Sequence, residues 1–387
     1  MPSPLPARST IHLRCATRLA VPACVAAALL ITAPAPSHAS APVQAPAPAS
    51  VQDSSGPYGP DVPPLFAAET PLEIRIESDF RQIRRDRRDE NPEHEGIVVV
   101  GEDDGTETEW PVQVRTRGNF RLQSNVCDFP PIRLNFPKSQ VEGGVFEGQD
   151  KIKLVTHCRD RYREELLREY LAYRIYNTVT DQSFRVRMAR VTYVDTSGRE
   201  DPLTRNAFFI EMEEALAERL GGEVIPDEEL EDGLHPARVS AENAARVDLF
   251  AYMVGNTDYT MYFPSDNGGL HNIVPVHREG GMVVAVPYDF DWTGLVDAPY
   301  SEPNPALGLR SVTDRIYRGM CRPGMDYAAA YRVFIAARPE IEALVTGMDI
   351  MEEDERRDVA RYLEDFWETV TDDGQARRRI EGACRPI

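Results

Sequence analysis

The sequence predicts an α+β fold of two lobes, a β-rich first lobe that carries one long helix and a mainly helical second lobe. Up to residue 210, apolar residues largely alternate with polar ones, which is the period of a half-buried strand. After Glu211, longer segments space their apolar residues as a helix does. We therefore expect the first lobe to span 66–210 and the second lobe 211–387.

The expected elements follow from these two periods. In the first lobe, strands are expected at 72–76, 97–100, 110–114, 132–136, 152–155, 188–194 and 207–212. The long helix is expected at 160–179, with its apolar residues largely on one face. In the second lobe, we expect helices at 241–255, 327–345 and 352–371, and two short strands at 272–276 and 282–286.

The N-terminus predicts export. The first 39 residues contain three arginines, no acidic residue and an apolar run, 19–33, that is too short to span a bilayer comfortably. This is the pattern of a cleavable signal peptide, with cleavage after Ala39 and Ala41 as the alternative. The Ala- and Pro-rich residues 40–65 are expected to form a disordered leader. We predict a periplasmic or secreted protein, and the pattern does not choose between the two.

Four cysteines follow the signal peptide: Cys127, Cys158, Cys321 and Cys384. An even number in an oxidising compartment predicts two disulfides. Sequence order favours Cys127–Cys158 and Cys321–Cys384, although three connectivities are possible. Neither a CxxC pair nor a His/Cys cluster with zinc spacing is present in the sequence.

The composition is strongly acidic. A formal net charge of −20 repels nucleic acid and anionic lipid, so neither is expected as a partner. The same charge favours a basic acceptor. No segment after the signal peptide is apolar for long enough to predict a transmembrane helix.

Polar residues gather at the ends of the expected elements in the second lobe. Asp258 follows the helix 241–255, Asn272 begins a strand, and Asp289 and Asp291 end the next strand. The turn between these strands would bring Asn272 and Asp289 together. An amide and carboxylates suit Mg²⁺, with Asp291 as a further ligand, and a separate carboxylate, Asp258, suits a group that orients a hydroxyl. This is the layout of a kinase catalytic centre; the alternative is that these residues only cap helices and turns.

Residues 110–300 also resemble the CotH kinase family. The strongest matches are Arg115-Thr116-Arg117-Gly118-Asn119 and Tyr288-Asp289-Phe290-Asp291. Further matches lie at 132–136, 151–155, 166–176, 209–211 and 255–258, together with Asn272. The resemblance implies a bilobal protein-kinase-like fold that binds ATP and Mg²⁺.

The resemblance also implies residue roles. Asp258 would be catalytic, Asn272 and Asp289 would bind the metal, and Glu211 would lie near the adenine. Glu165 or Glu169 on the long helix would pair with a cation that binds phosphate. The family's lysines are replaced here by Phe129-Pro130-Pro131, so that cation is expected to be one of Arg115, Arg117, Arg133 and Lys153.

The function expected from these features is an exported atypical kinase. It would transfer the γ-phosphate of ATP to a hydroxyl of a secreted protein or another envelope acceptor. The alternative is a non-catalytic envelope protein, a pseudokinase, that binds a partner or ligand in the cleft between the lobes. The missing lysines and the scarcity of ATP outside the cytoplasm favour this alternative.

Overall fold

The computed structural model describes residues 58–386 apart from 60–61, 88–90, 102–103, 161–163 and 266–268. The expected signal peptide and most of the expected leader lie outside the described residues. At the end of that leader, the Tyr58 hydroxyl donates a hydrogen bond to Asn177, 2.9 Å away, and Leu65 is fully buried. Packing therefore begins before residue 66.

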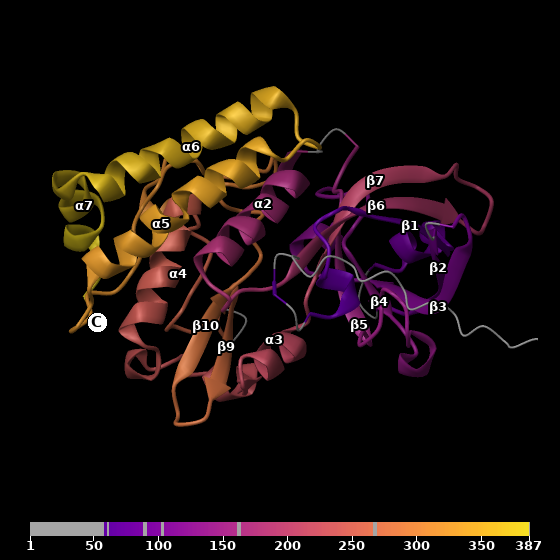
Figure 1. Ribbon diagram of the computed structural model, residues 1–387, viewed down its shortest axis with the longest axis horizontal. Helices are drawn as coiled ribbons and strands as arrows, with labels where there is room; N and C mark the ends of the chain where they lie inside the picture. The colour runs from indigo at the N-terminus through magenta and orange to yellow at the C-terminus, as the bar shows by residue number, and fades with distance from the viewer. Residues whose placement is uncertain are drawn as a thin grey trace, which may run out of the picture. The chain divides into compact units, whose positions relative to one another are not determined.

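Seven strands form a closed barrel (Figure 1). They are β1 (Leu72–Ser78), β2 (His94–Gly101), β3 (Glu107–Thr116), β4 (Ile132–Asn135), β5 (Lys151–Thr156), β6 (Val186–Asp195) and β7 (Leu203–Ile210). Their order around the barrel is β1-β2-β3-β4-β5-β7-β6. The barrel closes through parallel pairing of β1 with β6, where Leu72 lies opposite Ala189, and every other pair in it is antiparallel.

The closed barrel corrects the predicted fold class. We expected a bilobal kinase-like fold with a β-sheet first lobe, whereas the described residues form a closed seven-stranded mixed barrel with seven α-helices. Alternation of apolar and polar residues predicts a strand equally well in an open sheet and in a barrel. Closure depends on the pairing of β1 with β6, two segments far apart in the sequence, and the pattern within each strand does not encode it.

Two cores share the strands β6 and β7. Alternate residues such as Val191 and Phe209 point into the barrel, which is filled by aliphatic and aromatic side chains. The intervening residues, such as Met188 and Phe208, belong to a second core with the helix α2 (Glu164–Val179). We expected the apolar residues of this helix largely on one face. Instead α2 is buried around most of its circumference, because strands cover one side and helices the other.

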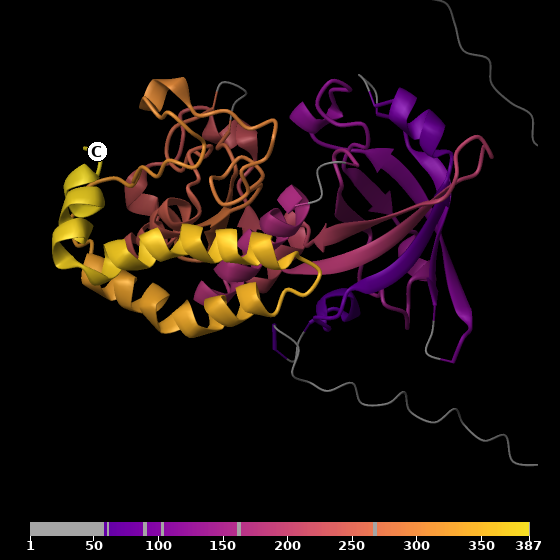
Figure 2. The ribbon, with the colours of Figure 1, turned by 90° about the horizontal axis from the view of Figure 1, so that it is seen from above.

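Most of the remaining helices and a small sheet lie on the far side of α2 from the barrel (Figure 1). The helices are α1 (Phe80–Arg85), α3 (Glu213–Arg219), α4 (Ala241–Val254), α5 (Tyr327–Thr346), α6 (Glu353–Thr371) and α7 (Asp373–Arg379), of which α1 alone belongs to the barrel. Figure 2 shows α5 and α6 side by side. The sheet has the order β10-β9-β8, with β8 (Gly222–Val224), β9 (Ile273–Arg278) and β10 (Val283–Pro287), and β10 packs on α4.

Two disulfides join Cys127 to Cys158 and Cys321 to Cys384. This confirms both the number of bridges and the pairing that sequence order favours. Such bridges are typical of proteins that fold in an oxidising compartment outside the cytoplasm. Among the described residues, no helix is long and apolar enough to cross a membrane.

Candidate functional site

The end of the β9–β10 hairpin brings two predicted site residues together. Ile273 lies opposite Pro287, and the Tyr288 amide donates a hydrogen bond of 3.1 Å to the Asn272 carbonyl. Asn272 and Asp289 therefore lie at the same end of the hairpin. Both have a left-handed backbone, with φ of 53° and 58°. Asn and Asp adopt this conformation more readily than other non-glycine residues, so the sequence suits the geometry.

The loop after α4 places Asp258 against Asn272. The helix ends at Val254, and the next residue, Gly255, turns the chain with a φ of 66°. The Asn256 side chain then accepts a 2.9 Å hydrogen bond from the Asp258 amide. Asn272 Nδ2 then donates to the Asp258 carbonyl at 2.7 Å and to Asp258 Oδ2 at 3.1 Å. Because the amide nitrogen faces Asp258, the amide oxygen of Asn272 faces away from it.

His271 completes this cluster. Its Nε2 lies 3.1 Å from Asp258 Oδ1, and about two fifths of each side chain is exposed. The hydrogen bond to Asp258 and the Asp258 charge raise the pKa of His271, against the opposing effect of burial. His271, which precedes Asn272 in the sequence, therefore pairs with Asp258 at the surface of the site.

A second group of predicted residues lines one small pocket. Arg117, Lys153, Glu169 and Asp289 contribute to it, and its remaining lining residues are Tyr173, Phe184, Ile210 and Tyr288. The cavity holds only about 20 Å³, so side chains nearly fill it. The structure therefore gathers two cations and two acids from the residue after β3, from β5, from α2 and from the end of the β9–β10 hairpin.

The two cations differ in their surroundings. Lys153 forms an ion pair with Glu213 at the start of α3. Burial lowers the pKa of Lys153, while the Glu213 charge opposes this shift. The Arg117 Nε is buried without a hydrogen-bond partner among the described residues. A buried donor without a partner is costly, so this position suits an anionic ligand.

Arg115 and Arg133 continue the positive charge across the outside of the barrel. Arg115 lies opposite Arg133, and Arg133 lies opposite Lys153 on the next strand. Directly opposed like charges are unfavourable in a sheet unless anions balance them. Glu93 lies 3.9 Å from Arg133 and Glu213 contacts Lys153. Neither Arg115 nor Arg133 lines the small pocket.

Two buried acidic residues, Glu169 and Asp291, lie next to Asp289. Glu169 is 3.6 Å from Arg121, and the Tyr300 hydroxyl donates a 3.0 Å hydrogen bond to Asp291. Burial, with a contribution from the Asp289 charge, raises the pKa of Asp291 to about 7. Burial and the Asp291 charge also raise the pKa of Glu169 well above its usual value. Both shifts reflect acids that are desolvated close to other acids.

Helix α2 connects these groups. The Asp289 amide donates a 2.9 Å hydrogen bond to the hydroxyl of Tyr173, one turn after Glu169 on α2. Of the two helix acids predicted to pair with a cation, Glu169 lines the pocket with Lys153. Glu165, one turn earlier, is not part of the pocket, and burial raises its pKa to about 7.

Glu211 has a different environment. It forms an ion pair of 2.9 Å with Arg219 and accepts a 3.1 Å hydrogen bond from the Arg185 amide. Its side chain is almost fully buried by these contacts. Its neighbour Ile210 lines the small pocket, whereas Glu211 does not. A role near the adenine stays a prediction.

The oxygen atoms at the hairpin end suit a metal ion that takes its other ligands from a bound phosphate. Among the described residues, no group of three His, Cys, Asp or Glu side chains lies close enough to hold a metal ion. Mg²⁺ in phosphate-binding sites usually takes one or two carboxylates, with phosphate oxygens and water as the other ligands. Asp289 and the amide oxygen of Asn272 fit this pattern.

A separate cavity of about 270 Å³ adjoins Asp258. Trp292 and Glu302 also line it, and the Trp292 ring packs edge-on against Phe120 at 5.2 Å. This cavity gives Asp258 access to a molecule that is not bound in the small pocket.

Sequence reasoning missed several residues of the site, namely Arg121, Tyr173, Glu213, Trp292 and Tyr300. Arg121 had a signal, because it lies two residues after the Arg115–Asn119 motif. Tyr173 lies within the 166–176 match and Trp292 directly follows Asp291, but neither residue type suggests a role in the site. Glu213 and Tyr300 lie outside any motif, and only the tertiary structure brings them to the site.

The chain matches no family model, and no curated protein matches it. The resemblance to the CotH kinases therefore stays a prediction, and the function rests on the geometry of the site.

Proposed function

We propose that this protein is an exported phosphotransferase that binds ATP with Mg²⁺ and transfers the γ-phosphate to a hydroxyl of a secreted or envelope protein. One observation carries the proposal: Asp289 lines a pocket with two cations, while its neighbour across the hairpin end, Asn272, holds Asp258. Phosphoryl transfer needs charge neutralisation and in-line positioning more than covalent chemistry. The disulfides and the N-terminal sequence support export, and the CotH-like motifs support the activity.

The phosphate groups would lie beside Arg117 and Lys153. Arg117 offers a buried Nε–H without a partner among the described residues, and a phosphate oxygen would satisfy it. Lys153 would exchange its Glu213 contact for a phosphate. The pocket must open for this, because its side chains leave about 20 Å³.

Asp289 and the amide oxygen of Asn272 would hold Mg²⁺, which neutralises charge on the phosphates when bound. Asn272 also fixes the position of Asp258 through its amide nitrogen. The Asn272 side chain would thus contact the metal through its oxygen and hold the acceptor-orienting Asp258 through its nitrogen. Asp258 faces the cavity with Trp292 and Glu302, where it would accept a hydrogen bond from the acceptor hydroxyl. The acidic lining favours an acceptor with basic residues beside the hydroxyl.

Calorimetric titration of the disulfide-bonded protein with ATP and Mg²⁺ tests the proposal. We expect binding by the wild type that requires Mg²⁺ and is lost in Asp289→Ala. Asp297→Ala is the matched control, because Asp297 is exposed and has the same left-handed backbone, with φ of 50°. Absence of nucleotide binding by the wild type at millimolar Mg²⁺ contradicts the proposal.

The second candidate is a non-catalytic protein that binds a partner or ligand through the same region. Two features favour this candidate: the cavity is too small for a nucleotide, and Lys153 is already paired with Glu213. A phosphate-transfer assay on secreted proteins separates the two. Nucleotide binding without transfer under any acceptor condition supports the non-catalytic candidate.

A further inference from the structure

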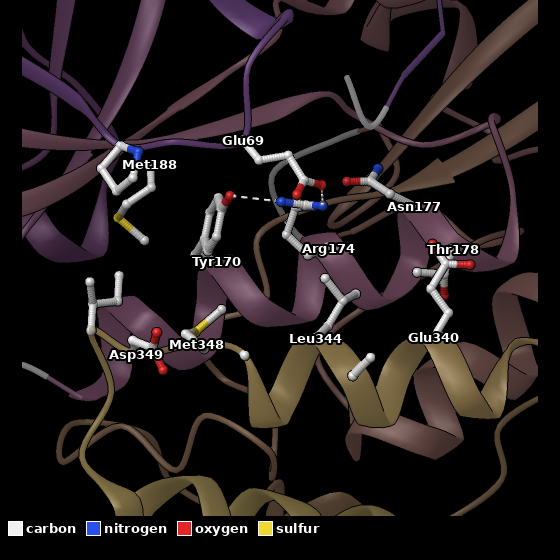
Figure 3. A pocket seen from close by; sticks show the side chains of 14 residues that line it. Glu69, Tyr170, Arg174, Asn177, Thr178, Met188, Glu340, Leu344, Met348 and Asp349 are labelled. Carbon is white, nitrogen blue, oxygen red and sulfur yellow. Dashed lines mark hydrogen bonds and ion pairs between the residues drawn. The ribbon is translucent and has the colours of Figure 1, made fainter. Parts of the chain in front are cut away.

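A larger cavity lies away from the candidate site, between α2, the end of α5 and the segment before β1 (Figure 3). Its volume is about 580 Å³, which suits a small molecule. The residues proposed for phosphate transfer do not line it.

A buried arginine forms the polar end of this cavity. The Arg174 side chain is only 9% exposed. Its Nη2 donates to Glu69 Oε1 at 2.8 Å, and its Nη1 donates to the Tyr170 hydroxyl at 3.1 Å. The Nε–H is buried and has no hydrogen-bond partner among the residues that the structure describes. Nε is therefore the one nitrogen of this guanidinium that has no hydrogen-bond partner among the described residues.

Glu69 covers this guanidinium from the side of the solvent. Figure 3 shows its carboxylate directed at Arg174 across the top of the cavity. The Glu69 side chain is 59% exposed and lies in the short segment before β1, so little holds it in place. Arg174 is buried, so it needs an anion beside it. A ligand carboxylate that replaces Glu69 keeps the guanidinium paired and releases Glu69 to solvent.

A ligand carboxylate would also bind better than Glu69 does. Nε and Nη2 lie on the same edge of a guanidinium, and a carboxylate can accept from both at once. Glu69 uses only Nη2. A free carboxylate that takes both donors would satisfy the buried Nε–H and gain the stronger bidentate geometry.

The rest of the cavity indicates the body of the ligand. Leu344 and Met348 supply an apolar wall below the guanidinium, and Met188 supplies another to its side (Figure 3). Glu340 and Asp349 line the cavity as well, and they oppose a second negative charge. The lining thus favours a single carboxylate on an aliphatic body over a phosphate or a dicarboxylate.

We propose that this cavity binds a small aliphatic monocarboxylate whose head group displaces Glu69 from Arg174. Acyl chains and apolar amino-acid derivatives share this chemistry. Titration of the disulfide-bonded protein with octanoate and with N-acetyl-leucine distinguishes the two sources. We expect one of these acids to bind with one molecule per chain, and octan-1-ol to bind at least about ten-fold more weakly because it lacks the carboxylate.

Two variants test the role of the guanidinium. Glu69→Gln removes the competing charge from an exposed position, so it should fold normally and tighten binding of the acid several-fold. Arg174→Gln should remove binding. Because Arg174 is buried and its variant can fail to fold, Glu69→Gln is the deciding measurement. An unchanged affinity in Glu69→Gln, or no binding of either acid to the wild type, overturns the proposal.

Discussion

Asn272 and Asp289 lie at the same end of the β9–β10 hairpin, and both have a left-handed backbone. For a residue other than glycine this conformation costs on the order of 1 kcal/mol, less for Asn and Asp than for most. Such strain persists where the surrounding structure determines it, and it is typical of functional sites. The Tyr288–Asn272 and Asp289–Tyr173 hydrogen bonds hold the two residues in place.

Glycine at position 289 should separate stability from function. Asp289→Gly relieves the left-handed backbone and removes a charge next to Asp291, so we expect the free energy of unfolding to rise by about 1 kcal/mol. Binding of ATP with Mg²⁺ should be lost. Chemical denaturation and calorimetry measure the two effects. Asp297→Gly, with φ of 50° at an exposed position, should leave binding unchanged. A variant at 289 that is less stable than the wild type would contradict the strain argument.

Lys153 should contribute to nucleotide binding more than its neighbour on the same strand. Lys153→Met removes a cation from the pocket, and we expect ATP affinity to fall by about ten-fold or more, measured by calorimetry. Lys151→Met is the matched control, because Lys151 lies two residues earlier on the same outer face of β5 and is exposed. Equal losses of ATP affinity in the two variants would show that Lys153 acts only through the overall charge of the surface and does not contact the nucleotide.

The strands and the hairpin of the site could be predicted from the sequence. Asn272 and Asp289 flank two short apolar segments joined by a Gly-Gly turn, and this pattern alone predicts their proximity. The disulfide pairing was predicted correctly because nearest cysteines in the sequence pair here.

Closure of the barrel and the buried acidic group could not be predicted in this way. The parallel pairing of β1 with β6 joins segments that are far apart in the sequence. Their alternation of apolar and polar residues would suit pairing with several other strands equally well. Likewise, the hydrogen bond from Tyr300 to Asp291 comes from an irregular segment with no periodicity to read. Local patterns report which face of an element is buried, and they do not report what buries it.

Asp291 should give the protein a pH-dependent stability. Its pKa is raised from its usual value of 3.8 to about 7, so the folded state holds a proton that the unfolded state releases between these values. The contribution of Asp291 to stability is therefore fully present below about pH 4 and is lost as the pH rises through 7. Asp291→Asn should remove this slope, and the variant should gain roughly 2–4 kcal/mol relative to the wild type between pH 4 and pH 8.

Denaturant unfolding of both proteins across this pH range measures the slope. The difference between them reports Asp291 together with its effect on Glu169, whose raised pKa depends in part on the Asp291 charge, whereas Glu165 contributes equally to both proteins. Parallel curves for wild type and Asp291→Asn would show that the buried carboxyl titrates as an ordinary acid.

The two disulfides should differ in their effect on the site. Replacement of either pair by serine should lower the free energy of unfolding by roughly 2–4 kcal/mol, because each bridge restricts the unfolded chain. Tyr300 packs against the Cys127–Cys158 bridge and donates to Asp291. We therefore expect loss of this bridge, and not loss of Cys321–Cys384, to weaken nucleotide binding. Equal effects on calorimetric affinity would contradict the link through Tyr300.

Asp258 should affect transfer and leave nucleotide binding largely intact. Asp258→Asn removes the carboxylate that would orient the acceptor, while Lys153 and Asp289 remain, so ATP affinity should change little. The transfer rate should fall by about 10²–10⁴-fold. The pKa of His271 should also fall toward its ordinary value, because Asp258 is the main cause of its rise. Calorimetry, a phosphate-transfer assay and NMR titration of His271 measure these three effects.

Glu302→Gln provides the control for Asp258→Asn. Glu302 lines the same cavity and takes no part in the Asn272–Asp258 hydrogen bonds, so its loss should raise the KM for a basic acceptor and leave kcat unchanged. This split follows because Glu302 would attract the acceptor in the ground state and the transition state alike. Full transfer activity in Asp258→Asn, with the pKa of His271 lowered as expected, would show that Asp258 positions His271 but does not act on the acceptor.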